Sequence, residues 1–99
     1  MKFILEFDNT LSALAGYDYG QDIFNDQIKS KITDYNIGFC FEFPENIEFI
    51  TSSFVQGFFS YMVGKIGFAG VESKVDIISK NSNITKEYVM GKLFEGTKY

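Results

Sequence analysis

Strict alternation of hydrophobic and polar positions marks three extended segments of the chain. Residues 1–7 alternate in this way, and residues 38–43 carry phenylalanine at every second position before Pro44. Proline has no backbone N–H to donate, so the second strand ends there. Residues 74–79 form the last predicted strand, while residues 11–15 are expected to give a short edge strand or a turn. Each full strand is expected to bury one side and leave the other in solvent.

Helical spacing of apolar residues follows the first and the third of these strands. Asp18 and Gln21 have the spacing of a capping box and predict a helix from about residue 18 to 33. Its buried side is expected to carry Ile23, Phe24, Ile28 and Ile32. A final helix is predicted over about residues 84–94, with Thr85 as its cap.

The segment 53–66 predicts a central helix that is apolar around most of its circumference. Ser53 and Gln56 give it a second capping-box spacing, and Gly67 is expected to end it. Small residues recur along one stripe of this helix: Ser53, Gly57, Ser60 and Gly64. The stripe indicates close approach by another backbone. Either an internal contact or a groove for a partner, including a second copy of the chain, would explain it.

Strands separated by helices predict right-handed crossovers and a mainly parallel sheet. Because the strands alternate instead of being apolar throughout, only one face of the sheet is expected to carry helices. The predicted fold is an α/β two-layer sandwich with a mixed, mainly parallel sheet of about four strands, in a single domain over residues 1–99. The open face of the sheet is expected to carry Glu6, Glu42, Lys74 and Asp76.

Charge and composition exclude several classes of function. The net charge is −4, with nine lysines scattered along the chain and no arginine. Binding to nucleic acid or to an anionic membrane requires a cluster of basic residues, and the sequence shows none. The apolar stretch 54–71 is interrupted by Lys65 and diluted by glycines, which favours a buried helix over a membrane span. No signal peptide pattern opens the sequence, and a cytoplasmic location is expected.

Catalytic chemistry has few candidates in this sequence. Histidine is absent, and the single cysteine, Cys40, lies between two phenylalanines in a predicted strand. The remaining candidates for enzymatic chemistry show no recognisable spacing; they are Asp8, Asp18, Glu42, Lys65, Lys80 and the tyrosines. We therefore expect a protein that is not an enzyme and has no metal or other cofactor.

Three consecutive hydroxyl residues, Thr51, Ser52 and Ser53, precede Phe54 at the predicted start of the central helix. A helix start presents free backbone N–H groups and the positive end of the helix dipole. The hydroxyls suit a docking surface or a phosphorylatable switch. Ser53 as a simple helix cap explains the same residues, and the sequence leaves both interpretations open.

The order of elements and the Thr51-Ser52-Ser53-Phe54 helix start resemble the bacterial STAS-like family, related to the STAS domains of anti-sigma-factor antagonists. The likeness runs from about residue 16 to 93. In the antagonists, the second serine of an Asp-Ser-Ser-Gly helix start is phosphorylated by a GHKL-type partner kinase, which controls partner binding. By position, the resemblance implies Ser53 as the phosphoacceptor, with Thr51 in place of the aspartate and Phe54 in place of the glycine.

The resemblance implies a non-catalytic regulatory module that docks a protein partner, such as a GHKL-type ATPase or kinase. The docking residues would be Thr51, Ser52, Ser53, Phe54 and Gly57. A second hypothesis is a small phage or mobile-element protein that inhibits a host system by binding one of its proteins. Compactness and acidity are compatible with it.

Overall fold

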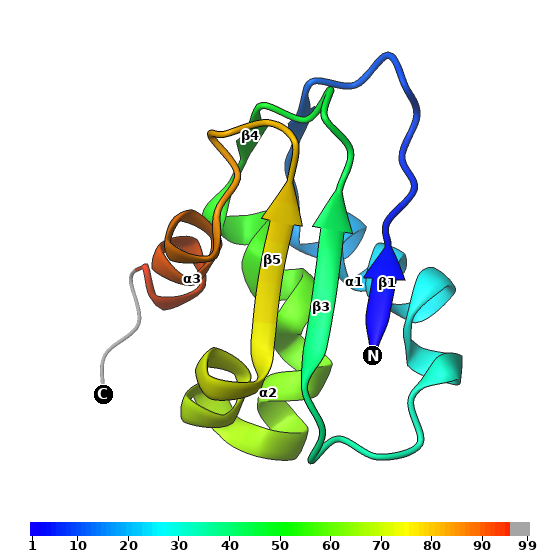
Figure 1. Cartoon of the computed structure of the whole chain (residues 1–99), viewed down its shortest axis with the longest axis vertical. Helices are drawn as coiled ribbons and strands as arrows, with labels where there is room; N and C mark the ends of the chain where they lie inside the picture. Colours follow the sequence, from blue (N-terminus) through cyan, green and yellow to red (C-terminus); the bar gives the residue numbers. More distant parts are fainter. Residues whose placement is uncertain (96–99) are drawn as a thin grey trace.

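The computed structural model describes residues 1–95, which form two parallel sheets, three α-helices and one 3-10 turn (Figure 1). In chain order the elements are β1 (Lys2–Ile4), β2 (Ala13–Leu14), α1 (Tyr17–Gln27), η1 (Lys29–Lys31), β3 (Phe39–Phe43), β4 (Phe49–Ile50), α2 (Ser52–Lys74), β5 (Val75–Ser79) and α3 (Lys86–Phe94).

The main sheet has the strand order β1-β3-β5, with every neighbour parallel. In Figure 1 these strands lie in front, with α1 and α2 behind them and α3 beside β5. The structure is therefore an α/β fold with its helices on one face of the sheet. The main sheet has three strands instead of about four, because β2 and β4 are only two residues long and pair with each other in a separate parallel sheet.

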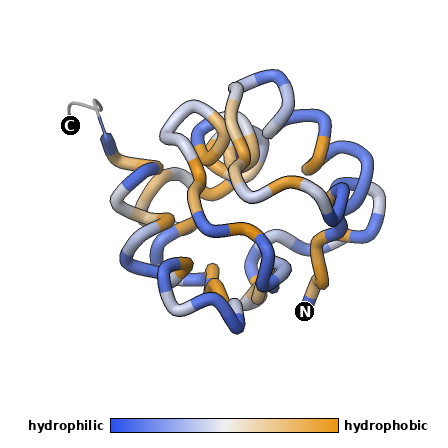
Figure 2. Tube along the Cα trace, turned by 90° about the horizontal axis from the view of Figure 1, so that it is seen from above, coloured by the Kyte–Doolittle hydropathy of each residue, from blue (hydrophilic) through white to orange (hydrophobic). Residues whose placement is uncertain are grey.

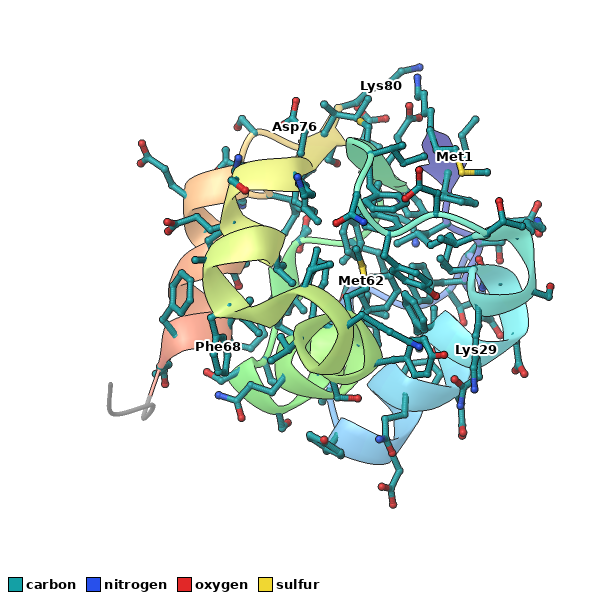
Figure 3. All side chains as sticks on the ribbon, turned by 90° about the horizontal axis from the view of Figure 1, so that it is seen from below. Met1, Lys29, Met62, Phe68, Asp76 and Lys80 are labelled. Carbon is teal, nitrogen blue, oxygen red and sulfur yellow. The ribbon has the colours of Figure 1, made fainter. Side chains whose placement is uncertain are left out.

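The alternation within the strands determines which side of the sheet is buried. Phe39, Phe41 and Phe43 are almost completely buried, and the Phe41 ring packs edge-on against Phe58 and Phe59 of α2. The opposite side of the sheet is open, as predicted, and Figure 3 places Met1, Asp76 and Lys80 together on that side. Lys74 is the exception to the predicted open face, because it ends α2 instead of starting β5.

The apolar circumference of α2 is explained by its neighbours. The helix lies between the sheet, α1 and α3, and Met62 sits in the middle of the interior (Figure 3). The predicted end at Gly67 is a break, not a terminus: Gly67 adopts φ 74° and ψ 170°, and helical backbone resumes as far as Lys74. Only glycine adopts such a φ without strain.

The capping box predicted at Asp18 is wrong. Helix α1 begins one residue earlier, at Tyr17, and its N-cap is Gly16 with φ 104° and no side-chain cap. The Gln21 amide instead donates to the Ser60 hydroxyl at 3.3 Å. The helix also ends at Gln27, before the predicted residue 33, and continues as η1.

Helix α3 forms where its sequence predicts it. Thr85 is the N-cap, and its side chain accepts the Tyr88 N–H.

Seen from the carboxyl ends of the strands, hydrophilic residues alternate with short hydrophobic stretches along the connecting loops (Figure 2). Within residues 1–95, no helix has the length and apolar character needed to cross a bilayer.

Candidate functional site

The start of α2 is positioned by the small sheet formed by β2 and β4. Leu14 lies opposite Ile50 in this sheet, and both side chains are completely buried. The next residue along, Thr51, donates its backbone N–H to the Leu14 carbonyl at 2.9 Å. This pairing holds the loop before α1 alongside the first turn of α2, so that Gly16 reaches the side chain of Ser53.

Two hydroxyl groups at this position form a short hydrogen-bonded chain. The Thr51 Oγ1 accepts the Phe54 N–H at 3.2 Å, and the Ser53 Oγ accepts the Gly16 N–H at 3.2 Å. The two hydroxyl oxygens lie 3.0 Å apart. Thr51 is therefore the N-cap of α2, and the predicted capping box of Ser53 with Gln56 is wrong. Thr51 takes this role because its pairing with Leu14 keeps it extended, at φ −78° and ψ 157°.

The predicted site residues divide into a surface group and a buried group. Ser53 is exposed, and Thr51 and Ser52 are half-buried. Phe54 is completely buried, and its ring packs with Phe7, Tyr19 and Phe58. The buried Gly57 lies against the backbone of α1. Phe54 and Gly57 can therefore hold the helix start in place but cannot touch a partner.

The stripe of small residues on α2 is mostly an internal contact with α1. A Cβ atom on Gly57 would collide with the carbonyl of Tyr17, and one on Gly20 would collide with the carbonyl of Phe54. Ser60 adds the hydrogen bond from Gln21. The partner groove considered for this stripe is therefore already filled by α1, and only Gly64, which is exposed, has open space beside it.

Two exposed aromatic residues beside the hydroxyls did not figure in the predicted site. Tyr17 is 44% exposed and follows Gly16 directly, and Phe49 is 50% exposed and precedes the buried Ile50. Neighbouring residues of a strand point to opposite sides, so the burial expected for Ile50 could have indicated that Phe49 faces solvent. Tyr17 could not be found in this way, because its exposure depends on where α1 starts.

Helix α3 supports the same region from the other side. The Tyr88 hydroxyl accepts the Ile50 N–H at 3.0 Å and lies 3.1 Å from the Ile50 carbonyl, to which it donates. The Lys92 ammonium lies 5.4 Å from the centre of the Phe49 ring. Gln56 donates its amide to the carbonyl of Glu95, at the end of α3, at 2.9 Å. The start of α2 is thus held rigidly by both α1 and α3.

The chemistry elsewhere in the described residues is limited. Cys40 is half-buried on the open face of the sheet, and desolvation, followed by the Asp76 carboxylate, raises the pKa of its thiol. Glu42 forms an ion pair with Lys2 at 3.2 Å. Hydrogen bonds from the backbone and then the side chain of Thr10 lower the pKa of Asp8. Among residues 1–95, no three acidic or cysteine side chains come together in a way that could hold a metal ion.

Comparison with protein-family models, with curated proteins and with solved structures finds no match to this chain.

Proposed function

We propose that this chain is a non-catalytic regulatory module that binds a protein partner through a surface around the start of α2. We call this surface the hydroxyl corner; it consists of Tyr17, Phe49, Thr51, Ser52 and Ser53. The observation that carries the proposal is the exposed Ser53, which bonds the backbone next to Tyr17, together with the 44% exposure of Tyr17 and the 50% exposure of Phe49.

Exposed aromatic residues on a rigid support favour protein binding. Tyrosine and phenylalanine bring a large apolar area and lose little conformational freedom on binding, and tyrosine is enriched among the residues that dominate interface energies. Here the support is rigid because Phe54 and Gly57 are packed inside and the Tyr88 hydroxyl bonds both backbone groups of Ile50. The hydroxyls of the hydroxyl corner add donors and acceptors that can pair with a partner.

We further propose that phosphorylation of Ser53 switches this binding, as the resemblance to STAS antagonists implies. Ser53 is the second residue of α2, where the helix dipole stabilises a negative group by about 0.3–1 kcal/mol. A phosphate would add about −1.5 to −2 charges to the hydroxyl corner, which should obstruct an apolar contact there. A GHKL-type kinase in the cytoplasm is the partner that this resemblance implies.

Site-specific crosslinking tests the proposal directly. A photoreactive amino acid replaces Phe49 in the protein expressed in its own cells, and a matched variant carries it at Ile78 on the open face of the sheet, where the side chain is 37% exposed. We expect one protein to be captured from position 49 and not from position 78. Capture of the same proteins from both positions, or of none from position 49, would contradict the proposal.

The switch is tested with the captured partner. Ser53→Asp should weaken binding at least about tenfold, since it places a charge in an apolar contact. Ser53→Ala, which removes one hydroxyl and adds no charge, should weaken binding less. Ser82→Asp, in the exposed turn before α3, is the matched control for added charge. Equal binding of Ser53→Asp and Ser82→Asp would refute the switch and leave the docking surface to be judged by the crosslinks.

A further inference from the structure

The exposed side of the contact between α1 and α2 brings two lysines together. The Lys29 ammonium lies 4.6 Å from the centre of the Tyr61 ring, and the Lys65 ammonium lies 5.4 Å from the same centre. The two nitrogen atoms are therefore at most 10.0 Å apart, which is the sum of these distances. Lys29 begins η1 and Lys65 belongs to α2, so it is the fold that places their charges side by side.

The Tyr61 ring that the two lysines share is held in place. Its centre lies 6.0 Å from that of the Phe24 ring and 5.8 Å from that of the Tyr35 ring. The helices that carry it and Phe24 are fixed against each other by the close backbone contacts at Gly20 and Gly57. The ring therefore gives two flexible side chains a common, fixed surface to lie on.

Neither of these lysines has a counter-ion among residues 1–95. The ion pairs in this part of the chain join Lys2 to Glu42 and Lys92 to Glu95. Two ammonium groups at this separation repel each other, and a dianion between them would replace the repulsion by attraction. An unpaired group of two positive charges is exceptional in a chain whose net charge is −4.

A hollow of about 280 Å³ opens beside Lys29 and the Tyr61 ring, between α1 and α2. Its polar lining residues are Gln21, Asn25, Lys29, Ser60 and Tyr61, and none of the described residues that line it is acidic. Asp26, the neighbour of Asn25, lines the separate groove beside β1 instead. The local absence of acids leaves the charge of the lysines available to a ligand.

The hollow also offers uncharged hydrogen-bond donors. Among the hydrogen bonds within residues 1–95, none uses the Asn25 side-chain amide. The Gln21 amide donates one N–H to the Ser60 hydroxyl at 3.3 Å, which leaves its second N–H for a ligand. Ammonium and amide donors around one hollow suit a ligand that carries negative charge and accepts several hydrogen bonds.

We propose that this hollow binds the phosphate group of a small phosphate ester, with the ammonium groups of Lys29 and Lys65 on the phosphate oxygens and the amides of Gln21 and Asn25 as neutral donors. A phosphate ester carries about −1.5 to −2 charges and three strong acceptor oxygens, which matches two positive groups from different elements. The volume lies just below the range of about 300–1,000 Å³ typical of ligand pockets, so the organic part of the ester is small. The site shares no residue with the hydroxyl corner and does not depend on the function proposed for it.

Titration of the chain with glycerol phosphate, followed by NMR of the backbone amides, tests the site. Sodium chloride keeps the ionic strength constant, because salt screens exposed charges. We expect saturable shifts in residues 21–29 and 60–65 with a Kd of about 1 mM, and weaker binding of inorganic phosphate at the same place. No saturable shift up to about 20 mM ester overturns the proposal. Tighter binding of inorganic phosphate than of glycerol phosphate overturns the ester as the ligand.

Single substitutions test the two lysines. Lys29→Gln and Lys65→Gln each remove one charge and should weaken ester binding at least about fivefold. Lys31→Gln is the matched control, because this exposed lysine lies in the same 3-10 turn as Lys29 but lines the groove beside β1. It should leave the Kd unchanged. An equal loss of binding in Lys31→Gln would show a general effect of charge and overturn the site.

A change of charge inside the hollow gives an independent test. Asn25→Asp keeps the size of the side chain and adds a carboxylate where the phosphate is expected, so it should weaken binding about tenfold or more. Asn83→Asp, in the exposed turn before α3, is the control for added negative charge. Because Asn25 is exposed, its variant is expected to keep the native circular dichroism spectrum. A folded Asn25→Asp chain that binds the ester as Asn83→Asp does overturns the proposal.

Discussion

The contact between α1 and α2 gives the most demanding test of the packing that supports the hydroxyl corner. Gly57→Ala adds one methyl group where the α1 backbone passes, and that methyl would collide with the Tyr17 carbonyl. The matched change, Gly64→Ala, lies two turns later on the same helix and meets no atom within 4 Å. Both changes replace glycine by alanine in one helix, so their difference isolates the contact.

The two substitutions should have opposite effects on stability. Alanine in place of glycine stabilises a helix interior by roughly 1 kcal/mol, which is the whole effect expected for Gly64→Ala. Inserting a methyl group into packed structure costs about 1–3 kcal/mol. At Gly57 the cost should reach or exceed the top of that range, because the obstacle is backbone and Gly20 holds the same two helices together a turn away. The net loss for Gly57→Ala is then about 2 kcal/mol.

Urea and thermal unfolding measure this difference. For a chain of this size, 1 kcal/mol corresponds to a change in Tm of about 4–8 °C, so Gly57→Ala should lower the Tm by about 8–16 °C and Gly64→Ala should raise it by about 4–8 °C. If the two variants shifted the Tm in the same direction by similar amounts, the close approach of α1 and α2 would be refuted.

Three further predictions concern the support of the site and the open face of the sheet. Tyr88→Phe removes the hydroxyl that bonds both backbone groups of Ile50 and should cost about 1–3 kcal/mol in urea unfolding; a loss below about 0.5 kcal/mol would argue against this bridge. Thr51→Ala should destabilise the protein by about 1 kcal/mol through loss of the α2 cap, while Thr51→Ser should be nearly neutral, and equal losses would show that the hydroxyl is not the cap. Because the pKa of Cys40 is raised, its alkylation rate should reach half its maximum at a higher pH than that of a free cysteine. Asp76→Asn should lower the pH of this midpoint, since it removes a nearby negative charge. A midpoint at or below that of a free cysteine would rule out desolvation and the Asp76 charge as the dominant influences on this thiol.

Sequence periodicity predicted the main strands and the open side of the sheet because each depends on neighbouring residues alone. The alternation of Phe39, Phe41 and Phe43 determines which side is buried whatever pairs with the strand. The stripe with Gly57 likewise indicated that a backbone comes close. The stripe could not indicate that this backbone belongs to α1, because the position of α1 depends on the turn that the chain makes at Gly16.

The details of the site depend on contacts that no local pattern contains. Thr51, Ser52 and Ser53 can all cap a helix by residue type, with serine slightly preferred, and the choice of Thr51 follows from the pairing of Leu14 with Ile50. Strands of two residues carry too little alternation to indicate their partner, so β2 and β4 were not expected to form a separate sheet. The side chain of Ser53 was then free to bond Gly16 instead of its own helix.

The central claim is that a partner covers the hydroxyl corner, and hydrogen–deuterium exchange tests it most directly. The protein is compared alone and with the partner captured from position 49. We predict that the partner slows amide exchange in residues 16–18 and 49–53 and leaves residues 75–79 unchanged. Slower exchange confined to β1 or β5, with residues 49–53 unaffected, would contradict the claim.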